Sequence, residues 1–307
     1  MNRKFISYAS LLIIVVFIGY IVYDSVKPVK STVEESSSVL DNMNIEDAWD
    51  VAGQIEVKEG KLNAVTVSQD GKIYAAGNSF VTCYGEGSEL LWSYKYESPL
   101  TALAVYGDTV FASSIDHILV ISGGKLLNEW GPFEANSIIT SVSAAKSRVA
   151  FSDAGNKKVY ILDKGGEVVA MAGQNEPQFV LPSAYFDVTI NADNTFWVAN
   201  TGHRRIEKRT SAGALDGFFG EAGLAPEAFC GCCNPSHFAV IPGGFITAEK
   251  GINRIKILDN KGDFVEFVSS KNDFEPSVPL DVASADGKTI YAANPADSKI
   301  YVFKRKI

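Results

Sequence analysis

The chain has little cysteine, little methionine and no recognisable catalytic signature. Its 307 residues include four cysteines and three methionines, and the motifs GxSxG, HExxH, CxxCH and the P-loop are absent. The sequence therefore gives no sign of the common nucleophile, zinc, haem and phosphate sites. Lysine and arginine number 28 against 36 aspartates and glutamates, for a formal net charge of -8. Such an acidic chain does not attract phosphates, so nucleic acid is not an expected partner.

A long apolar run lies near the N-terminus. Residues 5–23, FISYASLLIIVVFIGYIVY, contain no charged side chain. As a helix rising about 1.5 Å per residue, this run reaches about 28 Å, close to the thickness of the hydrocarbon core of a bilayer. A cleaved signal peptide is the alternative, but no A-x-A pattern follows, and Tyr20 and Tyr23 suit a membrane interface. We therefore expect an uncleaved transmembrane anchor at residues 5–23, after a cytoplasmic tip at residues 1–4.

The charges beside this run predict its orientation. Arg3 and Lys4 precede the run together with the terminal amine, and Lys27 and Lys30 follow it. The positive-inside rule favours an N-terminus in the cytoplasm, which places the rest of the chain in a periplasmic or extracellular location. Residues 24–47 are rich in Ser, Glu and Asp and predict a flexible tether, so the folded domain is expected to be residues 48–307.

From residue 48 onward, the chain repeats a pattern of short strands. The clearest copies are AVTVSQDGKIYAAG (64–77), DVTINADNTFWVAN (187–200) and DVASADGKTIYAAN (281–294), and weaker copies start at residues 102, 141 and 237. Each copy has an alternating apolar strand, a Gly/Asp/Asn turn and a second strand that ends in a small residue. These small residues recur every 37 to 49 positions at Ala76, Ser113, Ser152, Ala199, Ala248 and Ala293.

A hairpin-like pair of strands follows each copy, so the repeating unit has four strands. Periods of about 40 to 50 residues built from four strands predict an all-β fold, a β-propeller, and six copies predict six blades. No amphipathic helix pattern separates the strands, which argues against an α/β fold. The sixth copy reaches the C-terminus with only three strands. We expect AWDVAGQIEVK (48–58) to supply the missing outer strand and close the ring, because an open ring would expose a sheet edge.

Two segments resemble a known family. The run VANTGHRRIEKRTSAGALDGFFG (198–220) resembles an NHL repeat, and residues 48–307 resemble a six-bladed NHL-type propeller. The segment GCCNPSHFAVIPGGFITAEKGINRIKILDNKG (231–262) resembles a subgroup of uncharacterised bacterial extracytoplasmic NHL proteins in which GCCNP is followed by EKG. NHL propellers include lyases, hydrolases, sensor domains and RNA-binding scaffolds, so the resemblance implies a fold rather than one activity.

The resemblance also implies where a site would lie. In such propellers the innermost strand of each blade starts at the upper face, and the second strand returns to it. The polar residues at these two places are therefore expected to surround the mouth of the central channel. The candidate ligand-binding residues are Asp153, Asp187, Asn200, His237, Glu249, Asp281 and Asn294.

Three cysteines crowd into one loop before the fifth copy. Cys230, Cys232 and Cys233, with His237, form C-x-C-C-x3-H, a donor set that suits zinc or another thiophilic metal. However, three ligands within four residues strain a tetrahedron. Among the disulfide alternatives, Cys230 to Cys233 closes an easier loop than the neighbouring Cys232 and Cys233, whose Cα atoms lie only about 3.8 Å apart. We rank a local disulfide first, unreactive structural thiols second, and metal or redox chemistry third.

Two functional hypotheses follow. The first is a membrane-anchored binding or sensor module whose top face receives a small-molecule or protein ligand. The second is a metal-dependent or redox enzyme, lyase- or hydrolase-like, that uses the channel and the Cys230–Cys233/His237 cluster. The absence of a recognisable catalytic set favours the first, and the sequence names no ligand.

Overall fold

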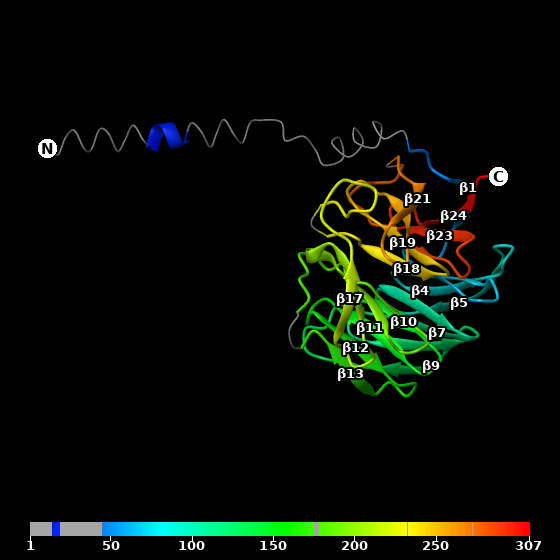
Figure 1. Cartoon of the computed structure of the whole chain (residues 1–307). Helices are drawn as coiled ribbons and strands as arrows, with labels where there is room; N and C mark the ends of the chain where they lie inside the picture. The colour runs from blue at the N-terminus through cyan, green and yellow to red at the C-terminus, as the bar shows by residue number, and fades with distance from the viewer. Residues whose placement is uncertain (1–13, 19–44, 175–177, 232, 272) are drawn as a thin grey trace, which may run out of the picture.

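The computed structural model of the chain describes residues 14–18, 45–174, 178–231, 233–271 and 273–307. The described residues form 24 strands arranged as six sheets of four antiparallel neighbours. Figure 1 shows these sheets following one another around a ring, from β4 and β5 in cyan to β23 and β24 in red. The predicted six-bladed β-propeller is therefore confirmed.

Blades are numbered here along the chain, each from its inner to its outer strand. Blade 1 has β2 (Leu62–Val67), β3 (Ile73–Gly77), β4 (Phe80–Tyr84) and β5 (Leu90–Lys95). Blade 2 has β6 (Ala102–Tyr106), β7 (Thr109–Ser113), β8 (Ile118–Ser122) and β9 (Lys125–Trp130). Blade 3 has β10 (Ile139–Ala144), β11 (Val149–Asp153), β12 (Lys158–Leu162) and β13 (Val168–Ala172).

The second half of the ring follows the same plan. Blade 4 has β14 (Val188–Ile190), β15 (Phe196–Asn200), the 3-10 turn η1 (Thr201–His203), β16 (Arg205–Arg209) and β17 (Leu215–Phe219). Blade 5 has β18 (His237–Ile241), β19 (Gly244–Ala248), β20 (Ile255–Asp259) and β21 (Phe264–Ser269). Blade 6 has β22 (Asp281–Ala283), β23 (Thr289–Asn294), β24 (Lys299–Arg305) and β1 (Trp49–Glu56).

The N-terminal strand closes the ring as the sequence predicts. Strand β1 pairs antiparallel with β24, from Trp49 opposite Arg305 to Glu56 opposite Lys299. The first strand of the domain thereby completes the last blade. Because a closed ring leaves no blade short of its outer strand, this pairing protects the sheet edge that the C-terminal copy alone would expose.

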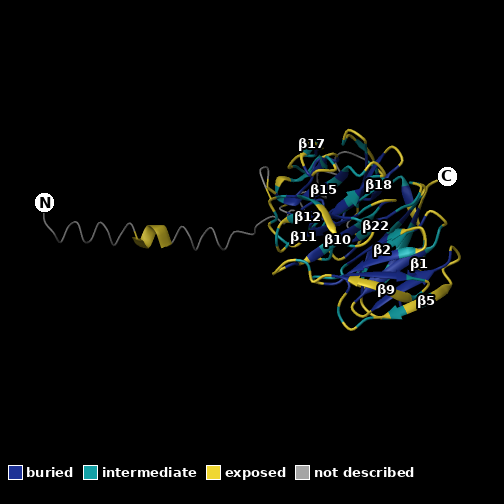
Figure 2. Ribbon diagram, turned by 90° about the horizontal axis from the view of Figure 1, so that it is seen from below, coloured by how far each residue is buried: buried dark blue, intermediate teal, exposed yellow. Residues whose placement is uncertain are grey.

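The core lies between adjacent blades. The second strands are nearly all buried, for example β3, β11 and β19 along their whole length, because they are covered on both faces by neighbouring sheets. The outer strands are more exposed, and in Figure 2 the exposed colour marks β5 and β9. One cluster of buried side chains joins Ala76 and Val81 of blade 1 to Leu103 and Leu119 of blade 2. The alternation of apolar residues in each strand thus supplies the two faces that stacked blades need.

The predicted anchor at residues 5–23 falls largely outside the described residues. Within it, residues 14–18 are described and form a helix. In the described parts of the chain, no helix combines the length and apolarity needed to cross a bilayer. The predicted tip at residues 1–4 and nearly all of the predicted tether at residues 24–47 also lie outside the described residues.

Candidate functional site

Each small residue that defines the repeat pairs with one residue near the start of the inner strand of its blade. We call the place of that partner the ring position. In blades 1, 2 and 3 the ring position holds a small residue, and in blades 4, 5 and 6 it holds an ionisable one. The facing pairs are Ala64 with Ala76, Ala102 with Ser113, Ser141 with Ser152, Asp187 with Ala199, His237 with Ala248, and Asp281 with Ala293. The same strand pairing in all six blades therefore gives a ring with a neutral half, blades 1 to 3, and an ionisable half, blades 4 to 6.

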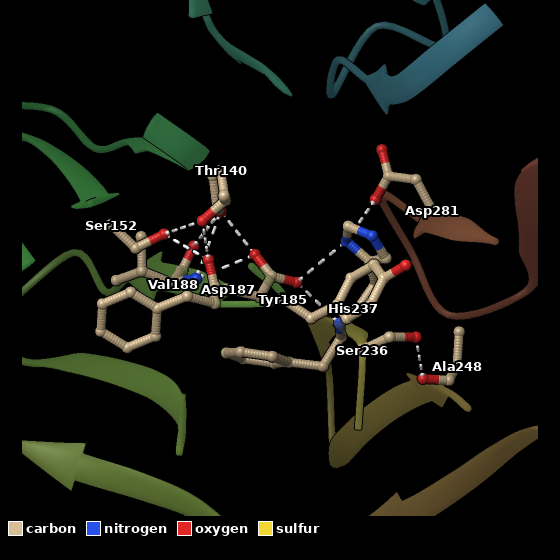
Figure 3. A network of polar contacts seen from close by, with 12 residues as sticks. Thr140, Ser152, Tyr185, Asp187, Val188, Ser236, His237, Ala248 and Asp281 are labelled. Carbon is tan, nitrogen blue, oxygen red and sulfur yellow. Dashed lines mark hydrogen bonds and ion pairs between the residues drawn. The ribbon is translucent and has the colours of Figure 1, made fainter. Parts of the chain in front are cut away.

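A cavity of about 170 Å³ occupies the central channel. It is lined by residues of the inner strands of all six blades, β2, β6, β10, β14, β18 and β22. Asp187, His237 and Asp281 line it together with small or hydroxyl-bearing side chains such as Ala102 and Ser141. Of the seven residues predicted to surround the mouth, the fold brings these three ionisable ones together in the channel (Figure 3).

The imidazole of His237 lies between the two carboxylates. Its Nδ1 is 3.7 Å from Asp187 Oδ2 and 3.5 Å from Asp281 Oδ1. Both distances exceed the usual N–H···O range of about 2.7–3.2 Å, so these contacts are ion pairs rather than tight hydrogen bonds. Both contacts use the same ring nitrogen, Nδ1.

Burial and charge shift two of these three groups. Burial by itself would lower the pKa of His237, but the carboxylates of Asp187 and Asp281 outweigh it and raise that pKa above its usual value. Burial raises the pKa of Asp281 to about 6, with the nearby Asp187 adding to the rise and His237 opposing it. Asp281 consequently changes protonation near physiological pH, as proton-transferring or pH-sensitive groups do.

The two aspartates also join neighbouring blades. Asp187 Oδ2 accepts a hydrogen bond of 2.8 Å from the backbone N–H of Phe238 in blade 5. Asp281 Oδ2 accepts one of 2.8 Å from the backbone N–H of Val65 in blade 1. Asp187 Oδ1 accepts a further bond of 2.5 Å from the hydroxyl of Ser141 in blade 3. These bonds fix the carboxylates, so the site is pre-organised by the packing of the blades.

In the first half of the ring, neutral side chains make the links between blades. Asn63 donates to the carbonyl of Leu100 at 2.9 Å, and Thr101 donates to that of Ile139 at 2.8 Å. Thr140 continues the series with a bond of 2.7 Å to Phe186 O. Sequence analysis missed Ser141, Thr101 and Thr140 as parts of this network. Aligning the copies at the ring position would have indicated Ser141, since its copy begins there.

The other four predicted residues do not line this cavity. Asp153 Oδ1 accepts the backbone N–H of Ile138, and Asn200 Oδ1 accepts that of Val180. Asn294 Oδ1 likewise accepts the backbone N–H of Ala296. Each residue lies one position beyond a small residue of the repeat, and its side chain holds a loop of the upper face. These three side chains therefore stabilise the loops around the channel mouth.

Glu249, the fourth of these residues, belongs to a fully buried ionic cluster. Its carboxylate is 2.7 Å from Arg254 Nε and 3.0 Å from Lys256 Nζ, and it accepts the backbone N–H of Cys230 at 3.1 Å. Burial lowers the pKa of Lys256 to about 8, although Glu249 acts in the opposite direction. The cluster holds the cysteine-containing loop against blade 5.

The GCCNP and EKG segments hold each other. The side-chain amide of Asn234 donates to the carbonyls of Cys230 and Lys250, and its oxygen accepts the backbone N–H of Lys250 at 2.9 Å. This arrangement places Lys250 Nζ 4.6 Å from the centre of the Tyr185 ring. The two motifs that carry the family resemblance therefore form one loop assembly beside the channel.

The structure does not support the predicted disulfide. Cys83, Cys230 and Cys233 are buried and form no disulfide, and Cys232 lies outside the described residues. Burial of the loop keeps the Cys230 thiol protonated instead: desolvation, with help from Glu249, raises its pKa to about 11. Cys230 thus lies beside Glu249, whereas His237 lies in the channel. Within the described parts of the chain, no three His, Cys, Asp or Glu side chains are placed to hold a metal ion.

Comparison with known proteins places the chain in a fold class. Neither models of protein families nor curated protein sequences give a match. Among solved structures, the chain is similar to the WD40 β-propeller domain of Doa1, with a TM-score of 0.57 and 14% identity over 84% of this chain and 97% of that one. It is similar to a streptogramin B lyase, with a TM-score of 0.59 and 13% identity over 83% and 97% of the two chains.

A third similar structure is a catalytically inactive histidine-to-alanine variant of virginiamycin B lyase from Staphylococcus aureus with quinupristin. Its TM-score is 0.57, with 17% identity over 81% of this chain and 82% of that one. Identities this low show the shared propeller fold alone, because one propeller architecture carries many unrelated functions.

Proposed function

We propose that the chain is a ligand-binding module that receives its ligand at the top of the channel, over blades 4 to 6. The observation that carries this proposal is the convergence of Asp187, His237 and Asp281 on one cavity. The connections that enter these three blades are also the longest, residues 173–187, 220–236 and 270–280, compared with 57–61 and 96–101 for blades 1 and 2. Longer loops over the ionisable half supply the surface for a partner.

We further propose that the propeller is of the NHL type and is held outside the cytoplasm by an anchor at residues 5–23. The run 198–220 that resembles an NHL repeat spans β15 to β17, the three strands outside β14 in blade 4. Strand β1 begins opposite the end of β24, at the face away from the ring position. A tether that enters at this lower face would present the top of the channel away from the membrane.

A screen of small molecules and peptides tests the binding function. Thermal shifts of the full chain and of a His237→Ala variant would be compared for each compound. We expect compounds that stabilise the wild type and not the variant, because binding to the folded state raises its stability. Circular dichroism would establish that the variant folds. If every compound that binds the wild type binds His237→Ala equally well, the ligand site lies elsewhere and the proposal fails.

Reporter fusions test the anchor separately. A reporter that is active only outside the cytoplasm, fused after Ile307, should be active, and a cytoplasmic reporter at the same position should be silent. The reverse pattern would contradict the proposed orientation, but it would not bear on the proposed channel site.

A second candidate function is an enzyme with His237 as proton donor or acceptor. A histidine whose pKa is raised by two carboxylates, beside an aspartate with a pKa of about 6, is suited to acid–base catalysis. The similar lyase that loses activity when a histidine becomes alanine gives this candidate some support. Turnover of any compound found in the screen would favour the enzyme over the binding module.

A further inference from the structure

We propose that the channel site takes an alkylammonium group, supplied either by a free amine or by a lysine side chain of a protein partner. This inference deepens the binding function proposed above and rests on it. It depends on the charge, the unused hydrogen-bond acceptors and the size of the cavity.

The site carries a net negative charge whenever both aspartates are ionised, whether or not His237 is protonated. Two carboxylates face one imidazole, so even a protonated His237 leaves an excess of one negative charge. Among the described residues that line the cavity, none is a lysine or arginine, and no titratable side chain other than these three is present. A bound cation would supply the missing positive charge in a partly buried setting, where such interactions are strong.

The carboxylates still have room for hydrogen-bond donors. Asp281 Oδ2 accepts the backbone N–H of Val65, and Oδ1 lies 3.5 Å from His237 Nδ1. The backbone N–H of Val282 also interacts with this carboxylate. Asp187 Oδ2 accepts the backbone N–H of Phe238 and is 3.7 Å from the imidazole. A carboxylate oxygen accepts about two hydrogen bonds, so each aspartate has unused capacity toward the channel. An ammonium group carries three donors on one atom, which suits acceptors on two sides.

The cavity admits a thin ligand. Its volume of about 170 Å³ is close to that of cavities that hold a single benzene ring, which is small for a whole metabolite. The wall opposite the charged half includes the small residues Ala102 and Ala104 of blade 2. An unbranched alkyl chain with a terminal ammonium fits this volume, with its methylene groups beside these alanines.

Binding of a cation here should displace a proton. His237 owes its raised pKa to Asp187 and Asp281, and an ammonium group placed between the same carboxylates would weaken that effect. The amine therefore competes with protonation of His237 and also with protonation of Asp281. Its affinity should rise with pH between about 5.5 and 7.5, and a neutral ligand of the same shape should show no such rise.

Calorimetry on the full chain tests this inference with n-butylammonium and 1-butanol as matched probes. We expect n-butylammonium to bind at least tenfold more tightly than 1-butanol at pH 7.5, and to lose about tenfold in affinity at pH 5.5. Titrations in two buffers of different ionisation enthalpy at pH 6.5 should reveal proton release. Asp281→Asn and Asp187→Asn should each weaken n-butylammonium at least tenfold. Asp193→Asn, a carboxylate on the β14–β15 turn at the lower face, should leave it unchanged.

An acetylated Gly-Lys-Gly peptide amide separates the two sources of the ammonium group. Tighter binding of the peptide than of n-butylammonium assigns the site to a partner's lysine, and weaker binding assigns it to free amines. Equal affinity for n-butylammonium and 1-butanol overturns the inference, and so does binding that survives both aspartate substitutions. Site-dependent binding of Mg²⁺, Ca²⁺ or Zn²⁺ without any binding of amines also overturns it. If the screen finds a neutral or anionic ligand that depends on His237, the ammonium proposal fails and the binding function stands.

Discussion

The first and second halves of the propeller ring share a backbone plan and differ in what they place at the channel. Blades 1 to 3 present Ala64, Ala102 and Ser141 at the ring position, and blades 4 to 6 present Asp187, His237 and Asp281. Neutral side chains such as Thr101 join adjacent blades in the first half. In the second half, carboxylates join adjacent blades and also face a histidine across the cavity.

The difference separates structural from functional demands on one repeat. A hydroxyl or amide is sufficient to satisfy the backbone of the next blade, as Asn63 and Thr140 show. A buried carboxylate costs free energy of desolvation and gives no better link between blades. The concentration of ionisable groups in three consecutive blades therefore indicates a role beyond ring closure, and the following experiments would break or sharpen that contrast.

The largest effect is expected at the buried cluster of blade 5. Glu249→Ala leaves Arg254 and Lys256 buried without their carboxylate, and breaking such a pair costs about 3–5 kcal/mol. Chemical denaturation would measure the loss in the free energy of unfolding. Asp216→Ala is the matched control, because its contact with Lys208 is a surface ion pair and is worth about 1 kcal/mol or less. Equal losses in the two variants would contradict a stabilising role for the cluster.

A change of pH is expected to have a smaller effect on the stability of the protein, and to act through the ionisable groups of blades 4 to 6. The pKa of Asp281 is raised to about 6, so the folded state favours its neutral form and loses stability as pH rises from about 4 through 6. The pKa of His237 is raised too, so its stabilising contribution is complete below about 6.5 and is lost as pH rises through its folded value. Both contributions therefore have the same sign.

Wild-type protein should consequently be more stable at pH 5.5 than at pH 7.5, by about 1–2 kcal/mol. Asp281→Asn keeps an acceptor for Val65 N–H and removes the ionisation, so it should reduce the difference by half or more. Urea denaturation at the two pH values measures this. A wild-type profile that is flat over this interval would refute the linkage.

The smallest effect is expected in the neutral half. Thr101→Val removes one hydroxyl that donates to the carbonyl of Ile139 and should cost about 1 kcal/mol, the usual net contribution of such a bond. Its cost should be the same at pH 5.5 and pH 7.5, since no ionisable group is involved. A loss that varied with pH would show that the two halves of the ring are coupled.

The strand pattern could be predicted because it depends on local alternation. The small residues Ala76, Ser152 and Ala293 marked the second strands, since a large side chain there would collide with the neighbouring blade. The pairing of residues 49–56 with the last blade followed from the count of strands. The disulfide predicted for the cysteine-rich loop is not supported: none is seen at Cys230 or Cys233, and the loop buries Cys230 beside Glu249.

The sequence by itself determined the number of blades, their closure and the three ionisable ring residues, because these depend on a period and on the alternation of side chains along each strand. Only the tertiary structure decided which polar residues meet. Asp153, Asn200, Glu249 and Asn294 lie at the ends of second strands rather than on inner strands, and their side chains bond to loops instead of lining the channel. Successive residues of a strand point to opposite faces, so the chemistry of each side chain depends on a register that three-dimensional pairing alone reveals.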